Sequence, residues 1–401
     1  MIPSLRHRDD LVPADEISAR IRLLQQTLQE KGVGAAWIEH ITDRFYFSGS
    51  AQDGVLLVPA HGDPRFFVKK SKKRADAESS LDVVPFPGTA KLVDAVHDFA
   101  GSDKKLGMAL DVTAASTYLK LAAALGDITI ADIAWQIRLQ RATKSEWEIG
   151  CIERASAQAT AIFENIEQYV REGIPEVEVS AAIEHDLRIM GHSGVVRIRR
   201  LGLELAMLTV AGGDAALYPT NFDGPVGGEG TSPFTAPGAG RRITANGETV
   251  MVDIVTGHNG YNADTARTFA IGSFNDLAAD AHRFCLDTIA QLEKRMRPGA
   301  VCADMFNEVM DWAKAQNPPE GFLGYEENRT KFFGHGVGIE LDELPIIADR
   351  VNIELRAGMV LAVEPKAFLP GIGPVGAEDT FVITEDGCRP LCPITRDIRV
   401  I

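Results

Sequence analysis

The chain has 401 residues, of which 45% are hydrophobic, and a formal net charge of −15. A chain of this length is longer than the chains that usually fold around a single hydrophobic core, and we therefore expect two domains. The acidic balance excludes a protein whose main function is binding to a nucleic-acid backbone, because the one short basic run, Lys69 to Arg74, is better explained as a solvated turn.

We expect a cytoplasmic protein, because the sequence shows neither a signal peptide nor a disulfide pattern. The N-terminal stretch MIPSLRHRDDLVPADE lacks the apolar core of a signal peptide, and no later apolar run is long enough to span a bilayer. The five cysteines are an odd number without a disulfide pattern, and we expect reduced thiols. Cys388 and Cys392 have the spacing of half a zinc site, but no second pair of ligands is evident nearby.

The first part of the chain alternates short strands with helices. Residues 14–31 have an amphipathic helical pattern. Further helices are predicted over residues 92–99 and 114–125, and strands over residues 34–38, 54–59, 65–68, 81–86 and 106–110. This alternation predicts an α/β domain over residues 1–137. Three of its histidines, His40, His61 and His97, are isolated from other candidate ligands, so we expect no active site there.

A second domain is expected over residues 138–401. Ser145-Glu146-Trp147-Glu148 has the form of a capping box, and the helix that it opens is predicted to run to about Arg171. The pattern then predicts helices over residues 176–190, 276–296 and 302–316, and strands over residues 194–200 and 205–211.

The segment Tyr218 to Gly240, YPTNFDGPVGGEGTSPFTAPGAG, is dense in glycine and proline. A loop of this length in a compact domain is usually functional or disordered. Because the loop leads into the strand that carries Asp253, we expect it to cover a site there. The alternative is a surface excursion without a role.

Thr249 to Ile271, TVMVDIVTGHNGYNADTARTFAI, predicts a β-hairpin. If the hairpin closes about the His258–Asn259 bond, Asp253 lies directly opposite Asp264, with Cβ atoms roughly 5 Å apart. Two opposed carboxylates in an apolar sheet are costly unless a cation lies between them. The alternatives are that one aspartate caps the turn or that a bulge breaks the register.

Three more candidate ligands follow. His335 lies between glycines in KFFGHGVGIE, Glu364 ends the apolar strand MVLAVEP, and Glu378 begins the strand VGAEDTFVIT. Taken singly, each is explained as a polar residue at a strand end. With Asp253 and Asp264 they make four carboxylates and one imidazole, which match two divalent cations.

Oxygen-rich ligation with one nitrogen suits manganese, iron, cobalt or zinc. Two such ions can share a hydroxide nucleophile and polarise a carbonyl, so hydrolysis of an amide is the reaction expected of this set.

The motifs VDIVTGHNGYNADTARTF, GHGVG, VEP and AEDTFVIT, in this order, resemble those of the pita-bread metallopeptidases, the family of prolidase, aminopeptidase P and creatinase. The resemblance covers nearly the whole chain. It implies a creatinase/prolidase-like α/β N-terminal domain, followed by an α+β pita-bread catalytic domain that opens near RATKSEWEI.

The same resemblance assigns ligands and substrates. It implies that Asp264, His335 and Glu364 hold one ion, that Asp253 holds the other with Asp264, and that Glu378 is shared. It also implies a Xaa-Pro-type aminopeptidase or dipeptidase that acts on short peptides, and a homodimer is expected.

The departures from the family concern the handling of substrate. Proline-specific relatives have a histidine where this chain has Leu217-Tyr218-Pro219, and a second one where it has Asp342. A common arginine is replaced by Gly376, and a glycine by Lys366. Each missing imidazole removes a group worth about 100-fold or more in rate. Four residues are candidates to replace them: His258, Tyr218, Asp342 and Lys366.

Two other functions therefore stay open. One is a pita-bread enzyme of altered chemistry, a C–N hydrolase or a lyase acting on a small molecule. The other is a non-catalytic binding module, which the five retained ligands disfavour.

Overall fold

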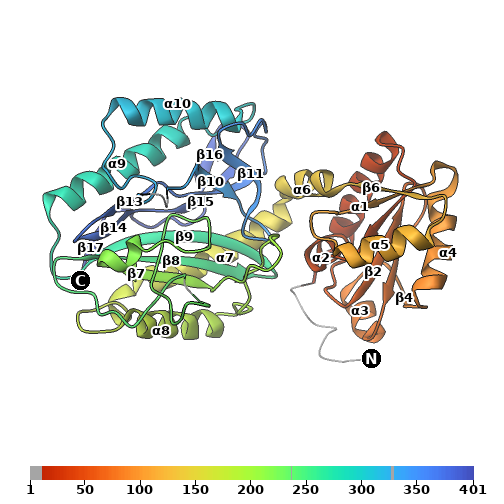
Figure 1. The fold of residues 1–401 in the computed structure, drawn as a ribbon, viewed down its shortest axis with the longest axis horizontal. Helices are drawn as coiled ribbons and strands as arrows, with labels where there is room; N and C mark the ends of the chain where they lie inside the picture. Colours follow the sequence, from red (N-terminus) through yellow and green to blue (C-terminus); the bar gives the residue numbers. More distant parts are fainter. Residues whose placement is uncertain (1–10, 236, 327–328) are drawn as a thin grey trace. The chain divides into compact units, whose positions relative to one another are not determined.

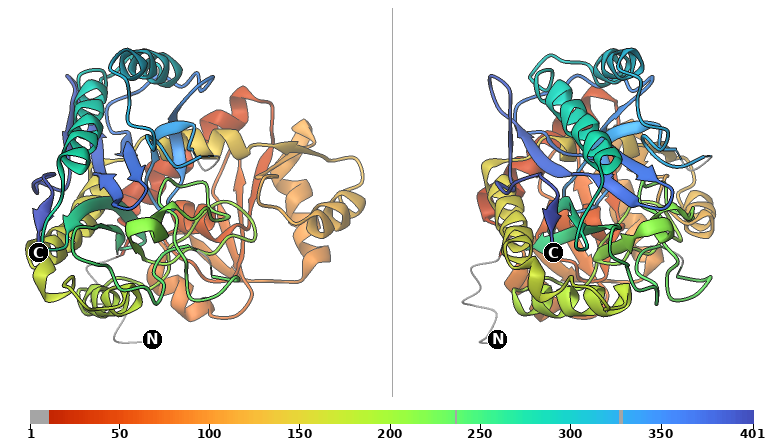
Figure 2. Two further views of the ribbon diagram at one scale, coloured as in Figure 1. Left: turned by 60° about the vertical axis from the view of Figure 1, so that its left-hand side comes forward. Right: turned by 90° about the vertical axis from the view of Figure 1, so that its left-hand side faces the viewer.

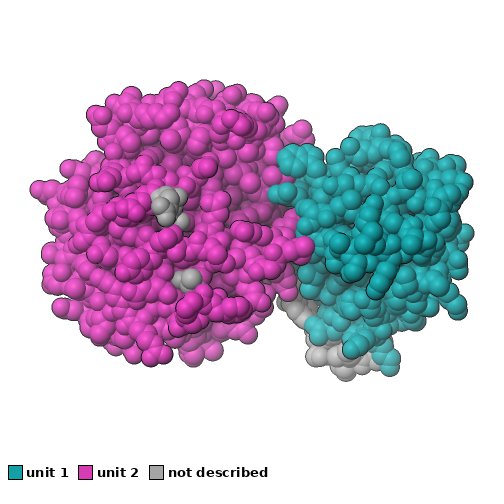
Figure 3. All heavy atoms as spheres, viewed as in Figure 1, with its two compact units in different colours: residues 1–141 teal, residues 142–401 magenta. Residues whose placement is uncertain are grey.

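The fold comes from a computed structural model, which describes residues 11–235, 237–326 and 329–401. The chain forms two compact units, residues 1–141 and 142–401 (Figure 3). The sequence-based boundary after residue 137 falls inside the helix at the end of the first unit. In the described part of the chain, no helix is long and apolar enough to cross a membrane.

The first unit is a mixed six-stranded sheet with the order β4-β3-β2-β1-β5-β6. The strands are β1 (Ala35–Ile38), β2 (Gly54–Pro59), β3 (Arg65–Val68), β4 (Asp82–Pro85), β5 (Lys105–Met108) and β6 (Thr129–Asp132). The helices are α1 (Ala14–Glu30), α2 (Ile41–Ser48), α3 (Lys72–Glu78), α4 (Thr89–Ala100), α5 (Ala115–Ala124) and α6 (Ala134–Ala142). The predicted α/β domain is therefore confirmed.

The second unit contains two larger sheets and a β-ribbon. One sheet has the order β17-β9-β8-β7, the other has the order β11-β10-β12-β15-β16, and β13 pairs with β14. The strands are β7 (Leu208–Gly212), β8 (Thr249–His258), β9 (Tyr261–Ala270), β10 (Phe332–Gly336), β11 (Glu343–Ala348), β12 (Val360–Val363), β13 (Lys366–Leu369), β14 (Gly373–Gly376), β15 (Asp379–Ile383), β16 (Cys388–Pro390) and β17 (Arg399–Val400).

Helices lie on both sides of these strands. They are α7 (Glu146–Glu164), α8 (Glu176–Ile189), α9 (Asp276–Glu293) and α10 (Cys302–Ala315). Figures 1 and 2 show α8 on one side of the strands and α9 with α10 on the other. Val250, Val252 and Ile254 of β8 pack into the core beneath α7 and α8. Because strand side chains alternate, Met251 and Asp253 face the opposite side of the sheet, toward the interior of the unit.

The predicted register of the β8–β9 hairpin was wrong. The hairpin turns through Asn259-Gly260, so His258 pairs with Tyr261 and Asp253 lies opposite Ala266, not Asp264. Both turn residues have positive φ, 51° and 83°, which is the geometry of the two-residue turn that Asn-Gly favours. The error shifts the register by two residues, and a shift of two leaves every side chain on its original face.

Two other expectations were wrong for local reasons. The helix α7 ends at Glu164 and not at about Arg171. At this end the Asn165 side chain donates a hydrogen bond to the carbonyl of Ala161, and a short 3-10 turn follows. The strand predicted at 194–200 is not formed and leaves only a single bridge, Val196 to Leu205, whereas the one predicted at 205–211 is present as β7, Leu208–Gly212. Gly194 and Gly202 have φ of +77° and +78°, which bends the chain between them.

The basic run Lys69 to Arg74 is also different from the predicted turn. Its second half begins α3, and Lys72 and Arg74 pair with Asp76 and Glu78 one turn ahead, at 2.7 Å each. Two of the positive charges of the run are therefore paired within the helix.

Candidate metal centre

Asp253 and Asp264 occupy neighbouring strands on the same face of the sheet. Asp264 lies opposite Val255, two residues along β8 from Asp253, so the two aspartates are diagonal neighbours. Asp264 is buried, and the side chain of Asp253 is 17% exposed.

The other three predicted ligands arrive from the second sheet. His335 lies in β10, Glu364 directly follows β12, and Glu378 directly precedes β15. Glu378 exchanges two backbone hydrogen bonds with Ala266 of β9, at 3.0 and 3.2 Å, and this bridge brings the two sheets together at the site. The fold thus gathers all five side chains in one place.

A sixth side chain, Lys366, lies among them. Its ammonium nitrogen, Nζ, is 2.8 Å from Oδ2 of Asp253, 2.7 Å from Oε2 of Glu364 and 2.6 Å from Oε2 of Glu378. The side chain is fully buried. Sequence reasoning identified Lys366 only as a departure from the family and a candidate replacement for a histidine. The signal that it belongs to the centre is a lysine in an otherwise apolar stretch, one residue after a ligand-bearing Glu-Pro.

The opposite strand makes room for this lysine. Lys366 pairs with Gly376 across β13 and β14. Gly376 has a φ of +126°, and a Cβ there would lie 2.9 Å from the Lys366 Cα. The two departures from the family, Gly376 and Lys366, are therefore direct cross-strand neighbours.

The remaining ligand atoms fit a divalent cation. Oδ1 of Asp264 and Oε1 of Glu378 are buried without a hydrogen-bond partner among the described residues, which is costly for a carboxylate. Nε2 of His335 is 3.9 Å from Asp264 Oδ2 and 3.7 Å from Glu364 Oε1, too far for hydrogen bonds. Ligand atoms of Asp264, His335 and Glu378 lie within 4.8 Å of one another. This spacing suits an ion whose bonds to nitrogen and oxygen are about 2.0–2.2 Å long.

His335 is oriented by its other nitrogen. Nδ1 lies 3.1 Å from the carbonyl oxygen of Gly336, and the Asp342 carboxylate is 3.5 Å from the same nitrogen. A proton on Nδ1 leaves Nε2 unprotonated toward the carboxylates, as a metal ligand requires. Asp342, a candidate catalytic residue in the sequence analysis, thus lies on the Nδ1 side of the imidazole, away from the ligand nitrogen Nε2.

Two carboxyl groups of the centre, those of Asp264 and Glu378, hold protons more tightly than usual. Burial, reinforced by Asp253, raises the pKa of Asp264 well above its ordinary value, and burial with Asp264 does the same to the pKa of Glu378. Burial alone would lower the pKa of Lys366, but the carboxylates of Asp253, Glu364 and Glu378 outweigh it and raise that pKa well above its usual value. The centre has a shortage of positive charge that Lys366 relieves only in part.

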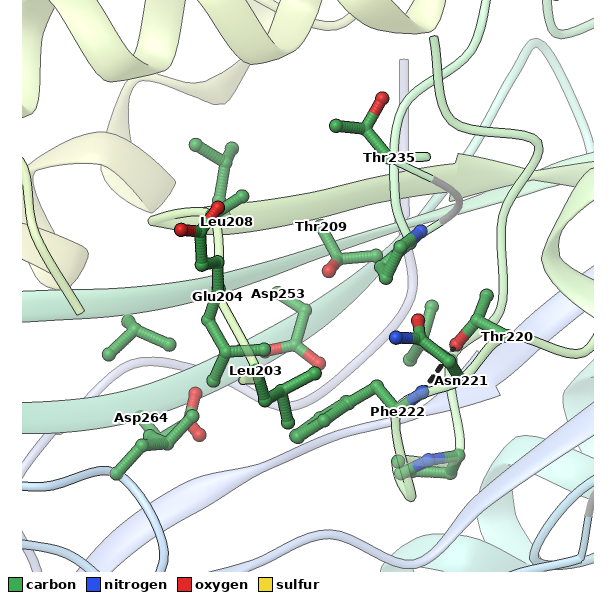
Figure 4. Close-up of a pocket in the computed structure, with 18 of the residues that line it drawn as sticks. Leu203, Glu204, Leu208, Thr209, Thr220, Asn221, Phe222, Thr235, Asp253 and Asp264 are labelled. Carbon is green, nitrogen blue, oxygen red and sulfur yellow. Dashed lines mark hydrogen bonds between the residues drawn. The ribbon is translucent and has the colours of Figure 1, made fainter. Parts of the chain in front are cut away.

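The centre opens into a cavity of about 840 Å³. Asp253, Asp264, His335, Glu364 and Glu378 form part of its wall. The Gly/Pro-rich segment supplies another part through residues 219–222, 224–226, 233–235 and 237. Figure 4 shows Asp253 and Asp264 on one side, with Thr220, Asn221 and Phe222 on the loop beside them. The segment borders the site, as its position in the sequence predicts.

The other two tentative catalytic residues lie outside this wall. His258 ends β8, five residues beyond Asp253 and thus roughly 17 Å away along the strand. Tyr218 is 52% exposed and does not line the cavity, although the next residue, Pro219, does. Of the predicted site residues, the structure brings together the five ligands, Asp342 and Lys366.

Two sheets that meet over a cluster of carboxylates and one imidazole define a metallopeptidase of the pita-bread fold. The chain belongs to metallopeptidase family M24, whose pattern matches residues 150–385, and residues 20–143 match the creatinase/prolidase N-terminal domain. Membership of this family makes the protein an enzyme of the peptidase class.

Named relatives match most of the chain. A Xaa-Pro dipeptidase from Pyrococcus furiosus is 25% identical over 94% of this chain and 99% of its own. The prolidase structure from Pyrococcus horikoshii has a TM-score of 0.79 at 22% identity, over 95% of this chain and 99% of that one. An X-Pro aminopeptidase structure from Thermotoga maritima has a TM-score of 0.77 at 22% identity, over 94% and 100%. At these identities the solved structures support the fold.

Proposed function

We propose that the protein is a metal-dependent Xaa-Pro-type peptidase that cleaves short peptides. One observation carries the proposal: buried carboxylate oxygens of Asp264 and Glu378 without a partner among the described residues lie beside Nε2 of His335, at the wall of a cavity large enough for a small peptide. Relatives named Xaa-Pro dipeptidase and X-Pro aminopeptidase agree with this reaction class.

Each residue of the centre has a defined part in this proposal. Asp264, His335, Glu364 and Glu378 would hold a divalent cation, which supplies Lewis-acid polarisation of the scissile carbonyl and activation of water when bound. Gly336 and Asp342 fix the orientation of the His335 ring. Manganese, cobalt, iron and zinc all suit this donor set.

The charge of the cavity wall favours an aminopeptidase over a dipeptidase. Among the described residues that line the cavity there is no lysine or arginine, whereas Asp253, Asp264, Glu364, Glu378 and Glu204 are acidic. The carboxylate of a dipeptide lies one residue from the cleaved bond and would have no cationic partner here. A peptide amine, by contrast, is attracted by the wall. We therefore propose substrates of three or more residues with a free N-terminus.

A panel of peptides tests this function. The full-length protein, stripped with a chelator and reloaded with Mn²⁺, Co²⁺ or Zn²⁺, should cleave Xaa-Pro-Yaa peptides and lose activity again on chelation. The kcat/KM for Xaa-Pro-Yaa should exceed that for the matching Xaa-Pro dipeptide by about 10-fold or more, the scale of one lost charge-assisted contact. Xaa-Ala-Yaa peptides serve as the control for proline.

Two outcomes contradict the proposal. Activity that persists in excess chelator would remove the metal from the reaction. A preference for the dipeptide would show that its carboxylate is recognised by a group outside this wall.

A second function is favoured by Lys366. A fixed ammonium in the centre, together with the missing substrate histidines, suits a pita-bread enzyme of altered chemistry that breaks a bond in a small molecule. Incubation with creatine and dimethylsulfoniopropionate, alongside the peptides, separates the two. Turnover of such a compound with no cleavage of any peptide would favour the second function.

A further inference from the structure

The contacts of Lys366 bear on how many metal ions the centre can hold. The side chains that could bind metal form two groups: Asp264, His335 and Glu378 in one, and Asp253, Glu364 and Glu378 in the other. The three carboxylates of the second group are the ones that Lys366 Nζ contacts, at 2.8, 2.7 and 2.6 Å. The first group contains the unpartnered oxygens.

We propose that the Lys366 ammonium permanently occupies one of the two cation positions, so that the centre binds a single divalent ion, held by Asp264, His335, Glu364 and Glu378. The inference rests on the metal-dependent function proposed above and specifies how many ions carry it.

The hydrogen bonds of Lys366 account for the whole ammonium group. An ammonium has three N–H donors, and Nζ has three carboxylate oxygens at hydrogen-bond distance, one from each residue. An ion held by the same three carboxylates would compete with Nζ for them and would displace it. The displaced ammonium would be left buried without partners, which is strongly unfavourable.

The backbone of Lys366 is held in place by hydrogen bonds to two neighbouring segments. Lys366 begins β13, where it pairs with Gly376, and its carbonyl accepts a hydrogen bond of 2.8 Å from the N–H of Leu323. Both its strand and its side chain are fully buried. A Cβ at position 376 would lie 2.9 Å from the Lys366 Cα and 3.4 Å from its Cγ, so glycine at this position gives the stem of the lysine its space.

The remaining position has the opposite character. Oδ1 of Asp264 and Oε1 of Glu378 have no partner among the described residues, and Glu364 directs Oε2 to Lys366 while Oε1 lies toward His335 Nε2. Glu364 and Glu378 thus each place one oxygen on the ammonium and leave the other for an ion. The two cations share two bridging carboxylates, one cation being part of the chain.

Metal stoichiometry measured by elemental analysis tests this inference without any activity assay. The full-length protein is stripped with a chelator, reloaded with excess Mn²⁺ and separated from unbound metal. We expect one ion per chain. Two ions per chain would overturn the inference and leave the proposed function standing, whereas no bound ion would overturn both.

Substitution of the lysine gives the second arm. Lys366→Gly removes the charge and opens the position, and we expect the content to rise from one ion to two. The exposed Lys331 provides a matched control, because Lys331→Gly removes a lysine outside the centre and should leave the content at one. A Lys366→Gly variant that folds and still binds a single ion would overturn the inference.

Electron paramagnetic resonance of the Mn²⁺-loaded protein provides a readout that does not depend on the variant. A lone Mn²⁺ gives the hyperfine pattern of an isolated ion, whereas two bridged ions are magnetically coupled. We expect the isolated pattern in the natural protein, and a coupled spectrum there would contradict the inference even if Lys366→Gly fails to fold.

Discussion

Three buried histidines of the second unit show how neighbours decide the role of one residue type. In His192, Nδ1 accepts from the N–H of Gly194 at 2.9 Å and Nε2 donates to the carbonyl of Val255 at 3.1 Å. His282 has the same arrangement with Gly376 and Arg396, at 3.0 and 2.7 Å. Each of these two rings is satisfied by backbone groups only in its neutral form. The Nε2 atom of His335, by contrast, faces carboxylates without a hydrogen bond.

This difference predicts a pH dependence of stability for His192. Burial lowers its pKa, because the charged ring would lose its hydration, and the nearby positive charge of Arg188 acts in the same direction. The unfolded chain, with a histidine pKa of about 6.5, then binds more protons than the native state below that pH. The free energy of unfolding should therefore decrease as the pH falls below about 6.5.

Urea unfolding of His192→Asn at pH 8 and pH 5.5 measures this contribution. The variant loses the bond to Val255 and should be less stable at pH 8 by about 1–2 kcal/mol, with a smaller deficit at pH 5.5. The exposed His97 gives the control, since His97→Asn should leave the natural pH dependence intact. Equal deficits for His192→Asn at the two pH values would refute the assignment.

The sequence revealed the ligands better than it revealed their partner. Asp253, Asp264, Glu364 and Glu378 stand out because a carboxylate in an apolar strand needs an explanation, and their order matches a family pattern. The signal of Lys366 is weaker, because most lysines are exposed and a single one in an apolar stretch does not point to a partner. Only the pairing of β13 with β14 places it inside the centre, and that pairing depends on contacts between residues that no local pattern specifies.

At the scale of elements, strong local signals were the dependable ones. The capping box at Ser145 is present, with both of its hydrogen bonds formed, and the helices α8, α9 and α10 begin where their patterns predict. Short strands such as β11 and β13 were missed, since four to six buried residues show no period. The hairpin register was wrong because turn closure at Asn259-Gly260 was placed one residue early, but the face of Asp253 was unaffected.

One part of the Gly/Pro-rich segment is hydrogen-bonded to the preceding residues, and another part is exposed at the cavity. The N–H groups of Gly227 and Gly228 donate to the carbonyls of Ala216 and Tyr218, at 3.2 and 3.3 Å. Phe234, in contrast, lines the cavity while being 92% exposed. An exposed aromatic ring at the cavity wall is available to an apolar group of a substrate.

Phe234→Ala tests this part of the loop without disturbing its base. We expect KM to rise roughly fivefold, which corresponds to about 1 kcal/mol of lost apolar contact, with metal content and unfolding unchanged. Leu119→Ala, at an exposed position of α5 in the first unit, is the control. If KM is the same in Phe234→Ala and the natural protein, the segment makes no contact with substrate through this ring.

At the scale of the whole molecule, charge extends the argument made for the cavity. A net charge of −15 and an acidic cavity wall give a field that attracts cationic peptides and repels anionic ones. The resulting steering is screened by salt, with a Debye length of about 10 Å at 0.1 M.

Salt titration of a matched pair of substrates checks whether the charge of the molecule steers peptides to the cavity. For an Xaa-Pro-Lys peptide, kcat/KM should fall by several-fold between about 0.02 and 0.5 M NaCl, whereas for Xaa-Pro-Glu it should rise or stay level. The two peptides share the same scissile bond and the same free amine. Identical salt curves would show that the field of the molecule has no influence on encounter with substrate.

Lys366 gives the centre one positive charge that belongs to the chain, in addition to the charge of a metal ion that the protein must bind from solution. A bound metal depends on supply and can be removed by a competitor, but an ammonium synthesised with the polypeptide is present in every copy from the moment of folding. Asp253 and the inner oxygens of Glu364 and Glu378 therefore have their counter-charge before any ion arrives. A shortage of metal should leave this protein inactive but still folded around its centre, ready to regain its ion when supply returns.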